Sequence, residues 1–250
     1  MSNPSDGQIK IFAGSASKVF VDKMCKYLET EPGKSYTHIF TEGSTYVRAD
    51  ESIRDKDVYI VQTIGKNPND SFMELIFWVD AFRRASANSI TAIIPYFGYA
   101  KADKKDEPRV SIRARVCADC IELCGCDRVL TMDLHAAQVQ GFFTKPVDHL
   151  YASSLLCEYA RRMGIVNDNL VVVSPDAGSA KRARAYANMI GCNVAIGDKV
   201  RLGHDENPNA LEIIGDVKGN TGMRVDDFGP RGNTHSKAAY GKMDKGAKDV

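Results

Sequence analysis

Short apolar segments alternate with amphipathic helical stretches along most of this chain. Ile9–Ala13, residues 57–63 and Leu170–Ser174 are apolar with little polar alternation. Such runs are typical of strands in a parallel sheet, because helices cover both faces of the sheet. Alternation of strand and helix therefore predicts the α/β class, with mostly parallel sheets flanked by helices.

The remaining helices and strands are predicted from the spacing of apolar residues, from capping residues and from apolar runs. Phe20, Met24 and Leu28 recur at helical spacing and predict one apolar helix face. Ser71 followed by Glu74 predicts a capping box at the start of the next helix. Further strands are expected at residues 90–96 and 128–133, and helices at residues 69–87, 112–123, 153–163 and 177–189.

One strand–helix series ends and another begins near residue 150. We therefore predict two similar α/β domains, of residues 8–149 and 150–250. The last residues, up to Val250, enter a new strand pattern, so we expect the second domain to be incomplete.

The charge balance excludes some classes of partner. Lys and Arg number 33 against 32 Asp and Glu, a formal net charge of +1, whereas dedicated nucleic-acid binders usually show a basic excess. No uninterrupted apolar run reaches membrane-spanning length, and the first residues, MSNPSDGQ, carry no secretory signal. We expect a cytoplasmic protein with neither nucleic acid nor membrane as partner.

The seven cysteines are an odd number, which favours free thiols in a reducing compartment. Four of them form a cluster, Cys117, Cys120, Cys124 and Cys126. The first three share one helix face and could hold a metal. No histidine or second cysteine pair follows at zinc-ribbon spacing, so packing against the core is the favoured interpretation.

Polar residues follow several of the predicted strands, where ligands of open α/β sheets collect. Asp133 and His135 would share a face if the chain stays extended, and could serve a magnesium ion that also contacts phosphates. Alone, His135 would more often be a hydrogen-bonded structural residue. Asp176 would more often be a helix N-cap.

Two further segments suit an anionic ligand. Lys199 and Arg201 would project on one side of an extended chain as a pair of cations, although such a pair can also simply open a solvated loop. Asp226 and Asp227 precede a glycine-containing turn, GPRGNT, which could bind phosphate through backbone N–H groups. The pattern GxxxxGK[ST] occurs nowhere, which excludes a Walker A loop.

In combination, these segments resemble the ribose-phosphate pyrophosphokinase family. The resemblance runs from about Ile9 to the last residue. It is carried by NDSFMELIFWVDAFRRASANSITAIIPYFGYAKADKK, RVLTMDLHAAQVQGFF, VVVSPDAGSAKRARAYA, and IIGDVKG before VDDF. It implies two phosphoribosyltransferase-like domains and a homo-oligomer with its active site near a subunit boundary.

The resemblance also implies a reaction: transfer of the diphosphoryl group of Mg-ATP to C1 of ribose 5-phosphate, with release of AMP, for nucleotide biosynthesis. His135 and Asp176 match the Mg²⁺ positions, and Lys199 and Arg201 the catalytic basic pair. Matching substrate positions are, for ATP, Phe40, Glu42, Gly43, Lys101 and Lys104, and for ribose 5-phosphate, Asp226, Asp227, Gly232, Asn233 and Thr234.

Three segments depart from the family pattern. FTEGS stands where the family usually has FSDGE, and KADK where it has RQDR. The phosphate loop ends in Arg231-Gly232-Asn233-Thr234, after Pro230, instead of a Thr-Gly-Gly-Thr type sequence. These departures keep a second hypothesis open, a non-catalytic homologue that regulates active subunits. A phosphoribosyltransferase would share the acidic loop but would not explain MDLHAAQVQGFF or DKVR.

Overall fold

The computed structural model describes residues 9–200 and 210–226. The chain divides into two compact units, Met1–Tyr151 and Ala152–Val250, and each is described by itself. The assignment of residues 8–149 and 150–250 as domains stays a prediction. No helix in the described part of the chain has the length and apolar character needed to cross a membrane.

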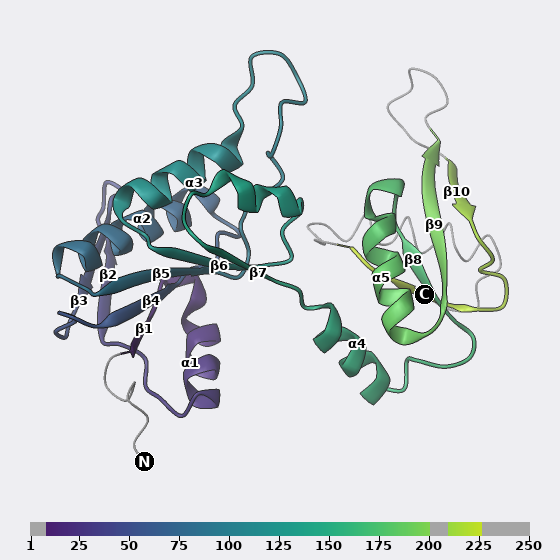
Figure 1. The fold of residues 1–250 in the computed structure, drawn as a ribbon, viewed down its shortest axis with the longest axis horizontal. Helices are drawn as coiled ribbons and strands as arrows, with labels where there is room; N and C mark the ends of the chain where they lie inside the picture. The colour runs from purple at the N-terminus through teal and green to yellow at the C-terminus, as the bar shows by residue number, and fades with distance from the viewer. Residues whose placement is uncertain (1–8, 201–209, 227–250) are drawn as a thin grey trace. The chain divides into compact units, whose positions relative to one another are not determined.

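The first unit is built on a five-stranded parallel sheet in the order β1-β4-β5-β6-β7 (Figure 1). Its strands are β1 (Ile9–Ala13), β4 (Asp57–Val61), β5 (Ser89–Ile94), β6 (Arg128–Met132) and β7 (Val147–Leu150). The helical elements are η1 (Ser15–Ser17), α1 (Lys18–Tyr27), α2 (Pro68–Arg84), α3 (Arg113–Cys124) and η2 (Ala137–Phe142). Since α1 covers one face and α2 and α3 the other, the predicted α/β class is confirmed.

A two-stranded antiparallel hairpin, β2 (Ser35–Ile39) and β3 (Thr45–Ala49), stands apart from this sheet. The sequence interpretation did not include it. Val47 and Ala49 pack against the main core, so the hairpin is attached to the unit through β3.

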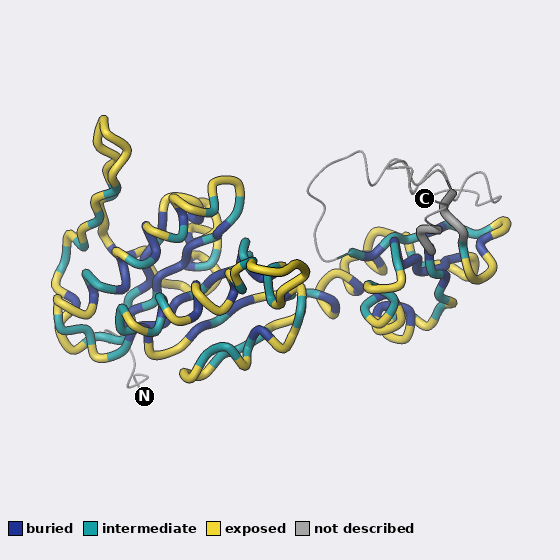
Figure 2. Tube along the Cα trace, turned by 90° about the horizontal axis from the view of Figure 1, so that it is seen from above, coloured by how far each residue is buried: buried dark blue, intermediate teal, exposed yellow. Residues whose placement is uncertain are grey.

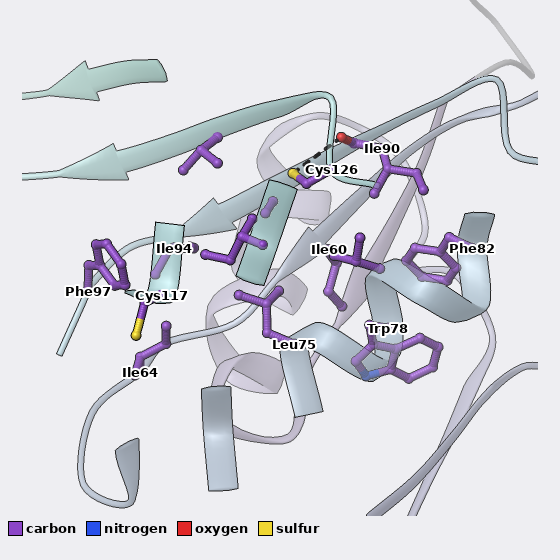
Figure 3. Close-up of a cluster of buried hydrophobic side chains, with 14 of the residues drawn as sticks. Ile60, Ile64, Leu75, Trp78, Phe82, Ile90, Ile94, Phe97, Cys117 and Cys126 are labelled. Carbon is purple, nitrogen blue, oxygen red and sulfur yellow. Dashed lines mark hydrogen bonds between the residues drawn. The ribbon is translucent and has the colours of Figure 1, made fainter. Parts of the chain in front are cut away.

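The main core lies between the sheet and helices α2 and α3. Figure 3 shows Leu75 and Phe82 of α2 beside Ile60 of the sheet, with the ring of Trp78 next to Phe82. The ring centroids of Trp78 and Phe82 are 5.2 Å apart, and Phe12 of β1 lies 4.8 Å from Phe82. Buried residues follow the strands through the middle of the unit, as Figure 2 shows. The predicted α2 face, with Leu75 and Phe82, is therefore confirmed.

The helix predicted from Phe20, Met24 and Leu28 is confirmed as α1, but of these three residues only Met24 packs against the core. Val21 and Cys25 are the buried residues, whereas Phe20 is 48% exposed and Leu28 52% exposed. Apolar residues occur on both sides of this helix, so spacing alone did not identify the buried side. Ser17 anchors the start of the helix by exchanging hydrogen bonds with Thr63 after β4, and this sets the rotation of α1.

The predicted cap at Ser71 is also wrong. Helix α2 begins earlier, at Pro68, and Ser71 is buried within its first turns. Proline suits the first helical position because it lacks an N–H that would have no intrahelical acceptor. Glu74, the second residue of the predicted capping box, is buried in the core instead.

The Glu74 carboxylate is 3% exposed and joins several elements of the first unit. It accepts hydrogen bonds from Ser15 N at 2.8 Å, from Gln62 Nε2 at 2.7 Å and from Trp78 Nε1 at 3.3 Å. Ser15 Oγ donates to it as well, and Thr37 Oγ1 of β2 lies 3.5 Å away. A buried charge is tolerated only with such partners, so these donors are what keeps Glu74 inside.

The second unit contains a four-stranded sheet in the order β10-β9-β8-β11. Its strands are β8 (Leu170–Ser174), β9 (Asn193–Val200), β10 (Ala210–Ile214) and β11 (Thr221–Arg224), and its helical elements are α4 (Ser153–Arg162), η3 (Ala177–Ser179) and α5 (Ala180–Ile190). Strands β11, β8 and β9 are parallel, and β10 is antiparallel to β9. Helix α5 packs on one face of this sheet through Ala183, Tyr186 and Ala187.

The clustered cysteines lie on and just after α3. Cys117 and Cys126 are buried in the main core, and Cys120 and Cys124 are partly buried. Burial raises the pKa of the Cys117 thiol to about 12 and that of Cys126 to about 11, which disfavours the thiolate that binds metals. Cys126 Sγ also contacts Ile90 O of β5 at 3.6 Å (Figure 3), as expected of a packed side chain.

Replacing Glu74 tests its role in the fold. Glu74→Ala leaves Ser15 N, Gln62 Nε2 and Trp78 Nε1 without their acceptor, so we expect a loss of about 3 kcal/mol in the free energy of unfolding. Urea denaturation measures it. The matched control is Asp80→Ala, which removes an exposed α2 ion pair with Arg84 and should have a much smaller effect. Equal losses in the two variants would contradict the role assigned to Glu74.

Glu122 of α3 gives the fold a pH dependence. Its carboxylate accepts hydrogen bonds from Thr144 N at 2.6 Å, Thr144 Oγ1 at 2.7 Å and Lys145 N at 2.8 Å, which fixes the turn before β7. Desolvation alone would raise the pKa of Glu122, but these hydrogen bonds outweigh it and lower the pKa.

A group whose pKa is lowered by folding stabilises the fold above its unfolded pKa, and this stabilisation is lost as the pH falls through the folded pKa. Wild type should therefore be more stable than Glu122→Gln at pH 7, and the difference should shrink toward pH 3. Thermal unfolding at both pH values measures it. A difference that is the same at pH 7 and pH 3 would show that the carboxylate charge is irrelevant.

Candidate functional site

The carboxyl ends of the parallel strands carry most of the described candidate residues. In the first unit, the segments after β5 and β6 lie at one edge, because these strands are parallel neighbours. In the second unit the same holds for the segments after β8 and β11. Ligands of open α/β sheets bind at such edges.

His135 lies just beyond β6 and is exposed. The strand ends at Met132, and Asp133 has a φ of 45°. Alternation along an extended chain therefore stops at Asp133, and the prediction that Asp133 and His135 share one face is wrong. Between them Leu134 is buried, and its N–H donates to His149 Nε2 at 2.9 Å, which fixes the turn that carries His135.

The predicted nucleotide-side lysines lie in the loop after β5. Lys101 and Lys104 are exposed. Asp103, between them, accepts a hydrogen bond of 3.2 Å from Gln138 Nε2 of η2. The loop after β5 is thereby tied to the segment after β6, so the structure brings Lys101, Lys104 and His135 to one edge of the first sheet. Sequence reasoning did not identify Gln138, since a single amide in a polar segment carries no spacing signal.

Phe40, Glu42 and Gly43 form the tip of the β2–β3 hairpin. Gly43 N donates to Phe40 O at 2.8 Å, and Gly43 has a φ of 91°, a left-handed conformation that glycine adopts without strain. Ser44 Oγ donates to Glu42 at 2.5 Å, and this hydrogen bond lowers the pKa of Glu42. The tip is therefore a defined turn that exposes one carboxylate and one aromatic ring.

Phe40 belongs to a row of exposed aromatic side chains along the hairpin. Its ring lies 4.8 Å from that of His38 and 6.4 Å from that of Tyr46, both edge-on, and Tyr36 stacks on His38 at 6.2 Å. The guanidinium of Arg48 lies 5.4 Å from the Tyr36 ring. Sequence reasoning found only Phe40 of this row. The alternation of Tyr36, His38 and Phe40 by two was the available signal for a strand.

Asp176 follows β8 in the second unit. Its Oδ1 accepts a hydrogen bond from Ser179 N at 2.9 Å, so it caps the helical segment that follows. The capping role expected from sequence is therefore present. Gly197 of β9 passes close to this turn: a Cβ at that position would lie 3.0 Å from Pro175 O. The absence of a side chain therefore allows β9 to approach the turn.

Asp226 follows β11 at the same edge as Asp176, because β11 and β8 are parallel neighbours. Its carboxylate forms an ion pair of 3.1 Å with Arg224. Lys199 lies in β9, opposite Leu211 of β10. The other predicted residues of this unit, Arg201, Asp227, Gly232, Asn233 and Thr234, lie outside the described residues.

The two residues assigned to magnesium belong to different units, His135 to the first and Asp176 to the second. Within residues 9–200 and 210–226, no group of three or more His, Cys, Asp or Glu side chains is placed to hold a metal ion.

Comparison with known proteins gives the same assignment over both units. Residues 9–125 match the family model described as the N-terminal domain of ribose phosphate pyrophosphokinase. The chain is 44% identical to the ribose-phosphate pyrophosphokinase of Gloeobacter violaceus over 246 residues, which is 98% of this chain and 73% of that protein. It is 45% identical to the Campylobacter jejuni protein of the same name, over 96% of this chain and 77% of that one.

A solved structure agrees. The phosphoribosylpyrophosphate synthetase of Mycobacterium smegmatis superposes with a TM-score of 0.90 at 36% identity, covering 97% of this chain and 79% of that one. The resemblance found in the sequence is thereby confirmed, and the chain belongs to the ribose-phosphate pyrophosphokinase family.

Proposed function

We propose that this chain is a ribose-phosphate diphosphokinase, which transfers the diphosphoryl group of Mg-ATP to C1 of ribose 5-phosphate. The proposal rests on sequence identity: the chain is 44% and 45% identical to two ribose-phosphate pyrophosphokinases over 98% and 96% of its length. The aligned part includes every segment predicted to bind substrate. No observation favours a purely regulatory homologue.

In the proposed reaction the C1 hydroxyl oxygen of ribose 5-phosphate attacks the β-phosphorus of ATP. A bond forms between the oxygen on C1 and the β-phosphorus. The bond between the β-phosphorus and the α–β bridging oxygen breaks, and AMP leaves with that oxygen. The hydroxyl proton passes to solvent. Positioning and electrostatic stabilisation carry most of phosphoryl-transfer catalysis, so no covalent intermediate with the protein is needed.

Lys199 and Arg201 are proposed to stabilise the negative charge on the migrating diphosphoryl group. Lys199 belongs to β9, the strand that pairs with β8, and Asp176 follows β8. Fixed donors of this kind stabilise charge that develops only in the transition state, and they thereby lower the activation barrier. His135 and Asp176 are proposed to hold Mg²⁺, which when bound neutralises phosphate charge.

Substrate binding is proposed to use the remaining candidate residues. The hairpin tip with Phe40, Glu42 and Gly43 would contact the nucleotide, Phe40 by stacking on the base and Gly43 by shaping the turn. Lys101 and Lys104, both exposed in the loop after β5, would contact its phosphates. Ribose 5-phosphate would be held by residues after β11: Asp226, Asp227, Gly232, Asn233 and Thr234.

The proposal also includes the assembly and the location of the enzyme. We propose a homo-oligomer whose active site lies near a subunit boundary, which would place the exposed hairpin beside a second copy of the chain. We propose a cytoplasmic enzyme, in keeping with an odd number of cysteines, which favours free thiols in a reducing compartment.

AMP release tests the reaction. Wild type incubated with Mg-ATP and ribose 5-phosphate should release AMP, and Lys199→Ala should lower kcat by roughly 10²–10³-fold because it removes one charge-stabilising donor. Chromatography of the nucleotides measures AMP, and thermal unfolding confirms that the variant is folded. Folded wild type that releases no more AMP than Lys199→Ala would disprove the catalytic role.

His135→Ala tests the magnesium assignment. His135 is exposed, so its truncation should leave the thermal midpoint almost unchanged while raising the Mg²⁺ concentration needed for half-maximal AMP release. Titration of MgCl₂ at fixed ATP measures this. The comparison variant is His149→Ala, which removes the acceptor of Leu134 N in the turn that carries His135 and, unlike His135→Ala, should also lower the thermal midpoint. If His135→Ala unfolds the protein, the residue is structural.

A further inference from the structure

Arg224 is the last residue of β11, two positions before Asp226. Its side chain is 10% exposed, that of Asp226 is 20% exposed, and Arg224 Nη2 donates to Asp226 Oδ2 at 3.1 Å. A guanidinium buried to this extent at the end of a strand is uncommon, since Arg is almost never buried without a partner.

Strand geometry places the two charges on one face of the second sheet. Met223 and Val225 pack against the α5 side. Arg224 alternates with them and lies opposite Val173 of β8, which belongs to the apolar cluster on the other face. Val225 N donates to Val173 O at 3.1 Å, so the ladder continues to the residue before Asp226. Backbone pairing therefore fixes Arg224 and extends to Val225, the residue before Asp226.

A buried ion pair is costly to form, because both groups lose hydration, and it is weak evidence for a role in stability. Apolar residues would fill this face of β11 at lower cost, as Val171 and Val173 do on the neighbouring strand. A geometric role is the better explanation. The pair holds the Asp226 side chain in one orientation at the edge of the sheet.

We propose that Arg224 is a positioning residue for ribose 5-phosphate binding, acting through Asp226. This inference rests on the proposed function, in which Asp226 contacts the sugar. A fixed carboxylate loses little side-chain entropy when it accepts the sugar hydroxyls. The guanidinium also offsets the repulsion between the Asp226 carboxylate and an anionic sugar phosphate, which favours this substrate over an uncharged sugar.

The test compares Arg224→Leu and Arg224→Lys with wild type. Leucine removes the charge and retains an apolar stem, so KM for ribose 5-phosphate should rise by about tenfold or more while KM for ATP stays within about twofold. Lysine keeps the charge without the planar fork and should give an intermediate KM. Arg162→Leu is the matched control, because it breaks an exposed pair with Glu158 in the same unit and should change neither constant.

The split between the two substrates separates positioning from mere stability. Equal rises in both KM values, or an unchanged KM for ribose 5-phosphate in folded Arg224→Leu, would overturn the proposal. If Arg224→Leu does not fold, Arg224→Lys decides: a rise confined to ribose 5-phosphate supports the proposal and no rise overturns it.

A binding measurement distinguishes failure of this inference from failure of the proposed function. Ribose 5-phosphate should raise the thermal midpoint of wild type, and this rise should be smaller in Arg224→Leu. Wild type that shows the rise but releases no AMP would refute the catalytic proposal and leave the role of Arg224 standing. An equal rise in wild type and Arg224→Leu would refute the role of Arg224.

Discussion

The hydrogen bonds to the buried Glu74 carboxylate are the interactions on which the arrangement of the first unit depends. Within the core this carboxylate binds the loop after β1 through Ser15, the end of β4 through Gln62, its own helix through Trp78, and reaches the β2–β3 hairpin at Thr37. Burying this charge is favourable only because these donors surround it. The same contacts connect α2 to the segment before α1 and to strand β2 of the hairpin. A polar contact in the core therefore influences the position of the hairpin tip with Phe40.

The candidate site follows from parallel topology more than from any single motif. Parallel pairing of β5 with β6 brings the loop of Lys101 and Lys104 to the segment of His135, and the Asp103–Gln138 hydrogen bond joins them. Parallel pairing of β8 with β11 brings Asp176 and Asp226 to a common edge. Each of these side chains alone would pass for an ordinary cap or surface charge. Within each unit, their position at neighbouring strand ends supports the proposal that these residues bind phosphate groups.

Buried strands were the part of the fold that the sequence predicted well. Continuous apolar runs located β1 and β8 to the residue, because strands covered on both faces have no polar alternation. The hairpin was missed, since Tyr36, His38 and Phe40 alternate on an exposed surface where apolar burial gives no guide. The α1 face and the Ser71 cap were wrong because tertiary contacts at Ser17 and a proline at the helix start decided them. The expected alternation at Asp133 failed because the backbone turns there, with a positive φ. Arg224, the partner of Asp226, was missed because a single arginine at the end of a strand forms no recognisable pattern in the sequence.

The central claim is that this chain moves a diphosphoryl group intact to C1 of ribose 5-phosphate. Phosphorus-31 NMR of the wild-type chain with Mg-ATP and ribose 5-phosphate tests it most directly, because it distinguishes the products of transfer from those of hydrolysis. We predict a new pair of coupled diphosphate resonances on the sugar, growing at the same rate as AMP, and no growth without ribose 5-phosphate. Formation of ADP and inorganic phosphate, or AMP with free pyrophosphate, would contradict the account.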